Sequence, residues 1–223
     1  MCYVILMLFK YLSKKKEEKP ETGGIKNIIF DVGQVLVDYD WETYLDSFGF
    51  EPAKRERIAK ATFQSPVWDE RDRGLYEVDV YLKQFQELDP EDAEDIEKVI
   101  RGTGGTIHKR PYADTWVKYL KSKGYHVYIL SNYSSYMLDH TKKELTFRRE
   151  MDGEVFSCYA KQLKPDAEIY QIILNKYQLK PEECVFIDDR SENCRGAQEQ
   201  GIHTICFKDF KQVTADLEKL GVK

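Results

Sequence analysis

This sequence of 223 residues lacks a long apolar run, closely spaced cysteines and an excess of basic residues. A membrane-spanning helix needs about 20 consecutive apolar residues, and the apolar stretch at residues 1–9 is too short. The five cysteines are widely spaced without a C-x-x-C pair, which argues against a zinc site or a disulfide framework and favours a cytoplasmic protein with reduced thiols. A net charge of −5 argues against nucleic acid as the main partner, because phosphate-backbone binders are usually basic.

The first 24 residues differ in composition from the rest of the chain. Residues 1–9 are almost wholly apolar, and residues 10–20 are strongly charged. A secretory signal carries its positive charge before its apolar run, whereas Lys14, Lys15 and Lys16 follow it here. We therefore predict a flexible or loosely docked extension over residues 1–24. The alternative is an anchor at a membrane surface, without stable insertion.

From Ile25 onward, short apolar strands alternate with amphipathic helices. Strands are predicted at Ile28–Phe30, His126–Leu130, Val155–Cys158, Cys184–Ile187 and His203–Phe207. Helices are predicted at Tyr112–Lys123, from Pro165 to about Tyr177, at Arg195–Gln200 and at Val213–Leu220. Continuous apolar strands separated by helices are typical of a parallel sheet that is covered on both faces. The sequence therefore predicts an α/β fold.

A helical region interrupts this alternation between residues 39 and 110. Val78–Leu88 has apolar residues at helical spacing, and Asp40 is a plausible N-cap for a helix that begins at Trp41. Asp38 is given the same capping role rather than a catalytic one. Because no strand pattern occurs here, we predict an all-helical inserted subdomain at 39–110, between core segments 25–38 and 111–223.

Polar side chains lie at the ends of three of the predicted strands and in the loop after a fourth. They are Asp31, the pair Ser131-Asn132, the pair Asp188-Asp189, and Lys164 in the loop after a fourth strand. The carboxyl ends of parallel strands meet at one crevice. Clustered carboxylates repel one another unless a cation lies among them, and oxygen ligands favour Mg²⁺. With Lys164 and Ser131 available for an anion, the set indicates phosphoryl transfer through an aspartyl-phosphate.

These residues lie in four motifs that resemble those of the haloacid dehalogenase (HAD) superfamily. The motifs are Phe30-Asp31-Val32-Gly33, Leu130-Ser131-Asn132, Lys164-Pro165-Asp166 and Phe186-Ile187-Asp188-Asp189. The sequence looks closest to sugar-phosphate phosphatases and to the N-terminal phosphatase domain of epoxide hydrolases. The resemblance implies a Rossmann-like, three-layer α/β/α core with a small helical cap.

The resemblance also implies roles for individual residues. Asp31 would be the nucleophile, Ser131 and Asn132 would contact the phosphoryl group, and Lys164 would hold both that group and the nucleophile. Mg²⁺ would be bound by Asp31, the Gly33 carbonyl, Asp188 and Asp189, of which Asp189 aligns better with the direct ligand than Asp188. Asn193 would orient the ligands from the outer shell. Arg71 or Arg73 of the cap could bind the substrate's polar groups, and a solvated salt-bridged face is the alternative.

Gly33 departs from the usual pattern of the superfamily's phosphatases. Most of them carry Asp-x-Asp, whose second Asp protonates the leaving alcohol, and a glycine cannot transfer a proton. The subgroup that this chain resembles also has glycine there. We expect a Mg²⁺-dependent phosphatase of a small phosphorylated metabolite, in the first place a sugar phosphate, that acts as a monomer or homodimer. The alternatives are a 2-haloacid dehalogenase, in which Asp31 would attack carbon, and a binding or regulatory module without turnover.

Overall fold

The computed structural model describes residues 24–223. The predicted extension over residues 1–24 therefore lies outside the described residues, apart from Gly24. A five-stranded sheet, in the order β5-β4-β1-β6-β7, forms the centre of the larger part of the chain. Its strands are β5 (Gly153–Phe156), β4 (His126–Ser131), β1 (Asn27–Phe30), β6 (Cys184–Asp188) and β7 (His203–Cys206), and every neighbouring pair is parallel. The predicted α/β fold with a parallel sheet is confirmed.

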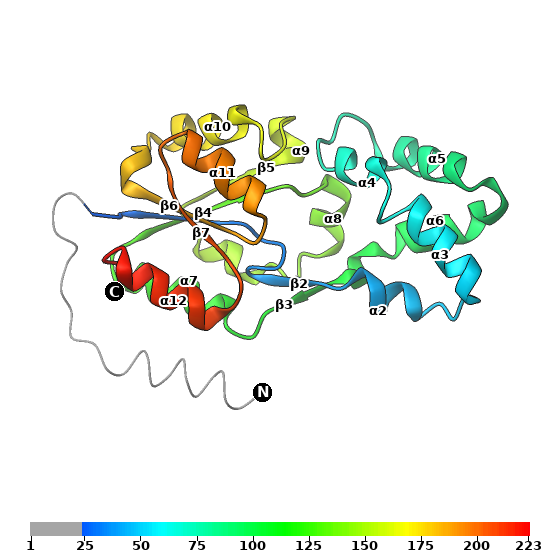
Figure 1. The fold of residues 1–223 in the computed structure, drawn as a ribbon, viewed down its shortest axis with the longest axis horizontal. Helices are drawn as coiled ribbons and strands as arrows, with labels where there is room; N and C mark the ends of the chain where they lie inside the picture. The colour runs from blue at the N-terminus through cyan, green and yellow to red at the C-terminus, as the bar shows by residue number, and fades with distance from the viewer. Residues whose placement is uncertain (1–23) are drawn as a thin grey trace.

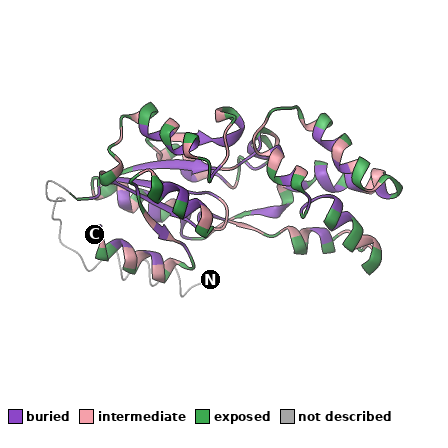
Figure 2. Ribbon diagram, turned by 45° about the horizontal axis from the view of Figure 1, so that its top comes forward, coloured by how far each residue is buried: buried purple, intermediate pink, exposed green. Residues whose placement is uncertain are grey.

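Helices cover both faces of this sheet (Figure 1). One face is covered by α7 (Ala113–Ser122) and α12 (Phe210–Lys219), and the other by α10 (Ala167–Tyr177) and α11 (Ser191–Glu199). Successive residues of a strand point to opposite faces: Ile28 and Phe30 pack with Trp116 of α7, whereas Ile29 packs with Ile169 of α10. The central strands β1 and β6 are buried at every residue, and Figure 2 shows most of the sheet in the colour of buried residues.

A separate group of helices lies beyond one end of the sheet (Figure 1). It comprises α2 (Trp41–Asp46), α3 (Pro52–Ala61), α4 (Pro66–Arg71), α5 (Val78–Leu88) and α6 (Ala93–Arg101). These helices, which we call the helical region, bury their own aromatic cluster around Phe63, Trp68 and Phe85. Asp40 caps α2 as predicted, since its Oδ1 accepts a hydrogen bond from the Thr43 N–H at 3.0 Å.

A two-stranded antiparallel ribbon joins the helical region to the sheet domain. It pairs β2 (Val37–Tyr39) with β3 (Ile107–Lys109). The prediction that no strand interrupts residues 39–110 is therefore wrong at β3, a three-residue strand too short for a periodic pattern. Asp38 lies in β2 and pairs with Arg110 at 2.9 Å, so its predicted capping role is also wrong.

The remaining elements are short. They are the helices α8 (Ser135–His140) and α9 (Ser157–Ala160) and the 3-10 turns η1 (Pro90–Asp92), η2 (Thr103–Thr106), η3 (Thr146–Glu150) and η4 (Pro181–Glu183). The strand predicted at Val155–Cys158 is shifted, because β5 ends at Phe156 and α9 begins at Ser157. Among the described residues, no helix is long and apolar enough to cross a membrane.

Candidate active site

Asp31 follows β1 directly, at the carboxyl edge of the sheet. Its Oδ1 accepts a hydrogen bond from the Val32 N–H at 2.7 Å and lies 2.9 Å from Lys164 Nζ. Burial raises the pKa of Asp31 to about 7; Lys164 opposes this rise and Asp188 adds to it. The pKa shows how poorly this carboxylate is compensated by the protein alone, since a buried charge needs a partner.

Lys164 links two of the carboxylates. Its Nζ lies 2.6 Å from Asp188 Oδ2 as well as close to Asp31, and it donates to the Leu130 carbonyl at 3.1 Å. Burial alone would lower the pKa of Lys164, but Asp188 and Asp31 outweigh it and raise the pKa. The ammonium is therefore held charged at the base of the site.

Asp188 has its acceptor positions filled by protein donors. Besides Lys164, it accepts from the Arg190 N–H at 2.8 Å and from Asn193 Nδ2 at 3.0 and 3.1 Å. Among the described residues, the carboxylate of the neighbouring Asp189 is bonded by its own backbone N–H and by no side chain. Burial raises the pKa of Asp189, and Asp188 raises it further. Of the two, Asp189 is better placed to offer a free oxygen to a cation.

The three carboxylates together suit a hard cation. Oxygen atoms of Asp31, Asp188 and Asp189 all lie within 4.8 Å of one another. One lysine cannot neutralise three such groups, and carboxylate oxygens are the ligands that Mg²⁺ prefers. The donor set therefore fits a magnesium ion, which would offset the burial and the repulsion from Asp188 that raise the pKa of Asp31.

The motif that contains Asn132 and the motif that contains Lys164 are joined by two hydrogen bonds beside this cluster. Asn132 Nδ2 donates to the Lys164 carbonyl at 3.0 Å, and the Lys164 N–H donates back to Asn132 Oδ1 at 2.9 Å. Ser131 is buried at the end of β4, and its Oγ has no hydrogen-bond partner of ordinary geometry among the described residues. Its hydroxyl is thus available to a ligand next to Asp31.

Gly33 leaves open space at the mouth of the cluster. A Cβ built on Gly33 would have no described atom within 4 Å. Gly33 therefore has no side chain that could transfer a proton, and the space beside its Cα is open.

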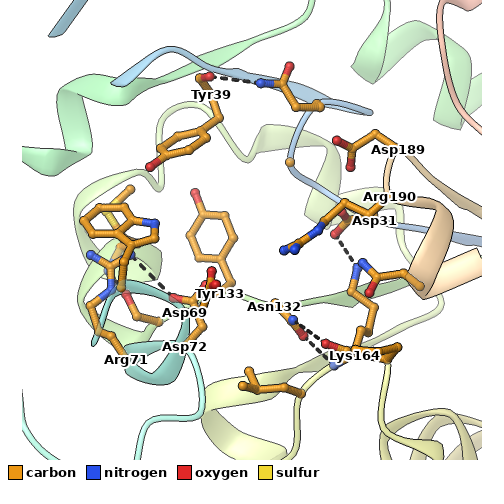
Figure 3. A pocket seen from close by; sticks show the side chains of 18 of the residues that line it. Asp31, Tyr39, Asp69, Arg71, Asp72, Asn132, Tyr133, Lys164, Asp189 and Arg190 are labelled. Carbon is orange, nitrogen blue, oxygen red and sulfur yellow. Dashed lines mark hydrogen bonds and ion pairs between the residues drawn. The ribbon is translucent and has the colours of Figure 1, made fainter. Parts of the chain in front are cut away.

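A pocket of about 360 Å³ connects the cluster with the helical region. At one end, which we call the carboxylate end, it is lined by Asp31, Lys164 and Asp189; at the other, the aromatic end, it is lined by Tyr39, Trp68 and Arg71. Figure 3 shows the two groups on opposite sides of the pocket, with Tyr133 between them. A bound molecule would therefore contact the sheet domain and the helical region at once.

The two arginines singled out in the sequence lie in different places. Arg71 is buried and lines the pocket. Arg73 pairs with Glu70 at 3.0 Å and approaches Asp166 at 3.8 Å, and it is not among the described pocket-lining residues.

Tyr39, Asp69, Asp72 and Arg190 also line the pocket, and sequence reasoning assigned none of them a role. Burial raises the pKa of Asp72 to about 6, while Arg71 lowers it and Asp69 raises it. Arg190 follows the Asp188-Asp189 pair directly, and Figure 3 shows its guanidinium directed into the pocket. In the sequence, Asp69 and Asp72 lie next to Arg71, and Arg190 follows the Asp188-Asp189 pair, which could have drawn attention to them. No sequence signal pointed to Tyr39.

Comparison with known proteins gives the family. A profile described as haloacid dehalogenase-like hydrolase matches residues 25–201. The chain belongs to the haloacid dehalogenase-like hydrolases. It is 25% identical to the sesquiterpene phosphatase astK of Aspergillus oryzae, over 87% of this chain and 96% of that protein. It is 27% identical to the D-ribitol-5-phosphate phosphatase of Bacteroides thetaiotaomicron, over 81% and 90%.

Two further matches place the fold of this HAD-like hydrolase. It is 30% identical to rat bifunctional epoxide hydrolase 2 over 45% of this chain, which spans only 19% of that longer protein. A HAD family enzyme from Bacteroides thetaiotaomicron, solved with magnesium and inorganic phosphate, superposes with a TM-score of 0.67 at 23% identity, covering 85% of this chain and 99% of that one. The expected resemblance to the HAD superfamily is confirmed.

In this hydrolase, the loop after α4 rests directly on the sheet domain. Ser157 Oγ donates to the Asp72 carbonyl at 2.5 Å, and Lys161 donates to the Gly74 carbonyl. Gly74 has a φ of +68°, and a Cβ there would lie 2.8 Å from the backbone of Cys158. Only glycine fits this approach, so the loop that carries the pocket residue Asp72 lies against the sheet domain.

Proposed function

We propose that this HAD-like hydrolase is a Mg²⁺-dependent phosphatase of a small phosphorylated metabolite, most simply a sugar phosphate. The observation that carries the proposal is the arrangement of Lys164 between Asp31 and Asp188, with Asp189 completing a carboxylate trio. Asp31, the Gly33 carbonyl and Asp189 would hold the ion, and Asp188 would contribute while orienting Lys164. When bound, Mg²⁺ supplies charge neutralisation for the phosphoryl oxygens.

The proposed chemistry has two steps. An oxygen of Asp31 attacks phosphorus, the bond from phosphorus to the leaving oxygen breaks, and an aspartyl-phosphate forms. The leaving alkoxide takes its proton from water, because Gly33 offers none. A second water then attacks the acyl phosphate, which releases inorganic phosphate and regenerates the Asp31 carboxylate. Lys164 balances the negative charge in both steps.

The surrounding residues support this assignment through the contacts they make. Ser131 has a buried hydroxyl beside Asp31 that makes no hydrogen bond of ordinary geometry among the described residues and suits a phosphoryl oxygen. Asn132 fixes the backbone of Lys164. Asn193 holds Asp188 through both carboxylate oxygens, which suits the outer-shell role. We assign Ser131, Asn132 and Lys164 to phosphate binding and Asn193 to positioning.

We also propose that residues 39–110 act as a cap subdomain over a core of residues 25–38 and 111–223. The ribbon of β2 and β3 lies at this division, and the helical region has its own apolar cluster. Two relatives that match over most of their length are phosphatases of a polyol phosphate and of a sesquiterpene. Because relatives of one family differ this much, the cap side of the pocket has to decide the substrate.

Phosphate release from p-nitrophenyl phosphate with Mg²⁺ tests the function, with Asp31→Asn as the matched variant. We expect wild type to hydrolyse this substrate and Asp31→Asn to be inactive. A screen of sugar phosphates would then identify the preferred substrate. Halide release from 2-chloropropionate without Mg²⁺, and none of phosphate, would favour the dehalogenase alternative. The carboxylate trio speaks against it, because displacement of halide from carbon needs no metal.

A further inference from the structure

The aromatic end of the pocket contains buried polar atoms without partners. Arg71 is 5% exposed, and its Nε and Nη1 make no hydrogen bond among the described residues. The buried hydroxyl of Tyr39 is likewise without a partner there. Both residues line the pocket. Native proteins seldom leave buried donors unpaired, so a bound group should complete these hydrogen bonds.

These side chains pack around one aromatic ring, that of Trp68. The Arg71 guanidinium carbon lies 3.6 Å from the Trp68 ring centroid. The Tyr39 ring is stacked on the same indole at 6.2 Å with an interplanar angle of 19°, and Trp68 packs on Phe63 at 4.6 Å. The donors are therefore pre-organised around one aromatic ring, as a binding site requires.

The charges at this end favour a neutral ligand over an anionic one. Asp72 Oδ1 lies 3.5 Å from Arg71 Nη2, and Asp69 lines the pocket beside them. The positive charge of Arg71 is thus already balanced, and what it lacks is acceptor oxygens. A carboxylate or second phosphate would bring a further negative charge next to Asp69 and Asp72. A hydroxyl group can accept from Arg71 or Tyr39 and donate to a carboxylate.

We propose that the aromatic end binds the hydroxyl groups of a polyol or sugar chain whose phosphate lies at Asp31, with Arg71 and Tyr39 as the specificity-determining residues. The proposal rests on the phosphatase function above and adds the class of group at the far end of the substrate. In Figure 3, Tyr39 and Arg71 face the pocket from the side opposite Asp31 and Asp189. A chain of several carbons would therefore reach both ends.

Three phosphates of the same length and the same primary leaving oxygen test the proposal. They are D-ribitol 5-phosphate, D-ribonate 5-phosphate and n-pentyl phosphate. The first carries only hydroxyls beyond its phosphate, the second carries hydroxyls and a terminal carboxylate, and the third carries no further polar group. kcat/KM is measured for wild type, Tyr39→Phe and Arg71→Lys. Tyr133→Phe is the matched control, because the Tyr133 hydroxyl also lies at the pocket but is already bonded to Thr141 at 2.9 Å. p-Nitrophenyl phosphate reports phosphoryl transfer independently of the far end.

We expect wild type to prefer ribitol 5-phosphate over pentyl phosphate. Tyr39→Phe should reduce that preference about 3- to 10-fold, and Arg71→Lys about 10-fold or more, as expected for neutral and charged hydrogen bonds. Tyr133→Phe should leave the preference unchanged. Equal losses on all substrates would show a purely structural role, and a preference for ribonate 5-phosphate would show an anion site; either overturns the proposal.

Failure of the phosphatase function gives a different pattern. Wild type would then not hydrolyse p-nitrophenyl phosphate at all. In that case, calorimetric titration of the intact chain with Mg²⁺ and the same three phosphates still decides the question. Tighter binding of ribitol 5-phosphate that Tyr39→Phe weakens would uphold the hydroxyl site, and equal binding of all three would refute it.

Discussion

Substitution of Gly33 tests how this enzyme releases its leaving group. Gly33→Asp places a carboxyl group where most phosphatases of the superfamily carry their proton donor. A Cβ at Gly33 meets no described atom within 4 Å, and Gly33 is not among the residues with positive φ. The new side chain should therefore be accommodated without backbone strain.

The expected gain depends on the leaving group. General acid catalysis contributes about 10²–10⁴-fold when the leaving oxygen holds negative charge poorly. Primary alkyl phosphates should therefore gain most of that factor, and p-nitrophenyl phosphate, whose leaving group needs no proton, almost none. A fourth carboxylate beside Asp31 also adds repulsion, so the variant should require Mg²⁺ at least as strongly as wild type.

Single-turnover rates against leaving-group pKa measure this effect. Wild type should show a steep line, with anomeric, aryl and acyl phosphates reacting much faster than alkyl phosphates. Gly33→Asp should flatten the line, while Gly33→Asn, which has the same size but no transferable proton, should leave it steep. A flat line for wild type would refute the reasoning and show that another residue supplies the proton. Asp72, which lines the same pocket and whose pKa burial raises to about 6, would then be the first residue to replace.

Three further perturbations follow from the contacts described above. Asp189→Ala should lose phosphatase activity at ordinary Mg²⁺ concentrations. Excess chelator should abolish the phosphatase activity of wild type, and full activity in chelator would exclude a role for the metal. Lys164→Met removes the cation between Asp31 and Asp188 and should reduce kcat at least 10²-fold at saturating Mg²⁺, with circular dichroism to establish that the fold persists. Gly74→Ala forces a Cβ to 2.8 Å from the Cys158 backbone and should lower the free energy of unfolding by about 1–3 kcal/mol, measured by urea denaturation; an unchanged value would mean that the loop can move aside.

Much of the site was accessible from sequence because it depends on local patterns. Asp31, Ser131 and Asp188 each follow or end an apolar strand, and parallel strands bring such ends together. The hydrogen bonds that orient these residues are different. Asn132 bonds to Lys164, 32 residues away, and Asn193 bonds to Asp188, five residues away, and no periodicity of the sequence reveals either pair.

The aromatic end was less accessible for the same reason. Tyr39 lies in a three-residue strand, and its place beside Trp68 depends on how α4 packs. Whether Arg71 or Arg73 faces the pocket depends on the packing of a single helix turn. Neighbouring charged residues look alike in sequence, although one is buried against an indole and the other pairs with Glu70.

The ribbon of β2 and β3 has a consequence for how substrate enters. Both chain crossings between the proposed cap and core run through this one pair of short strands, so the ribbon can serve as a hinge about which the helices swing as a unit. The opposite rim is closed by the Ser157 and Lys161 hydrogen bonds to the loop after α4. A swing of the helices about the ribbon that opens this rim to substrate or product would break both of these hydrogen bonds. The turnover rate would then depend on how fast this rim opens as well as on the chemical steps.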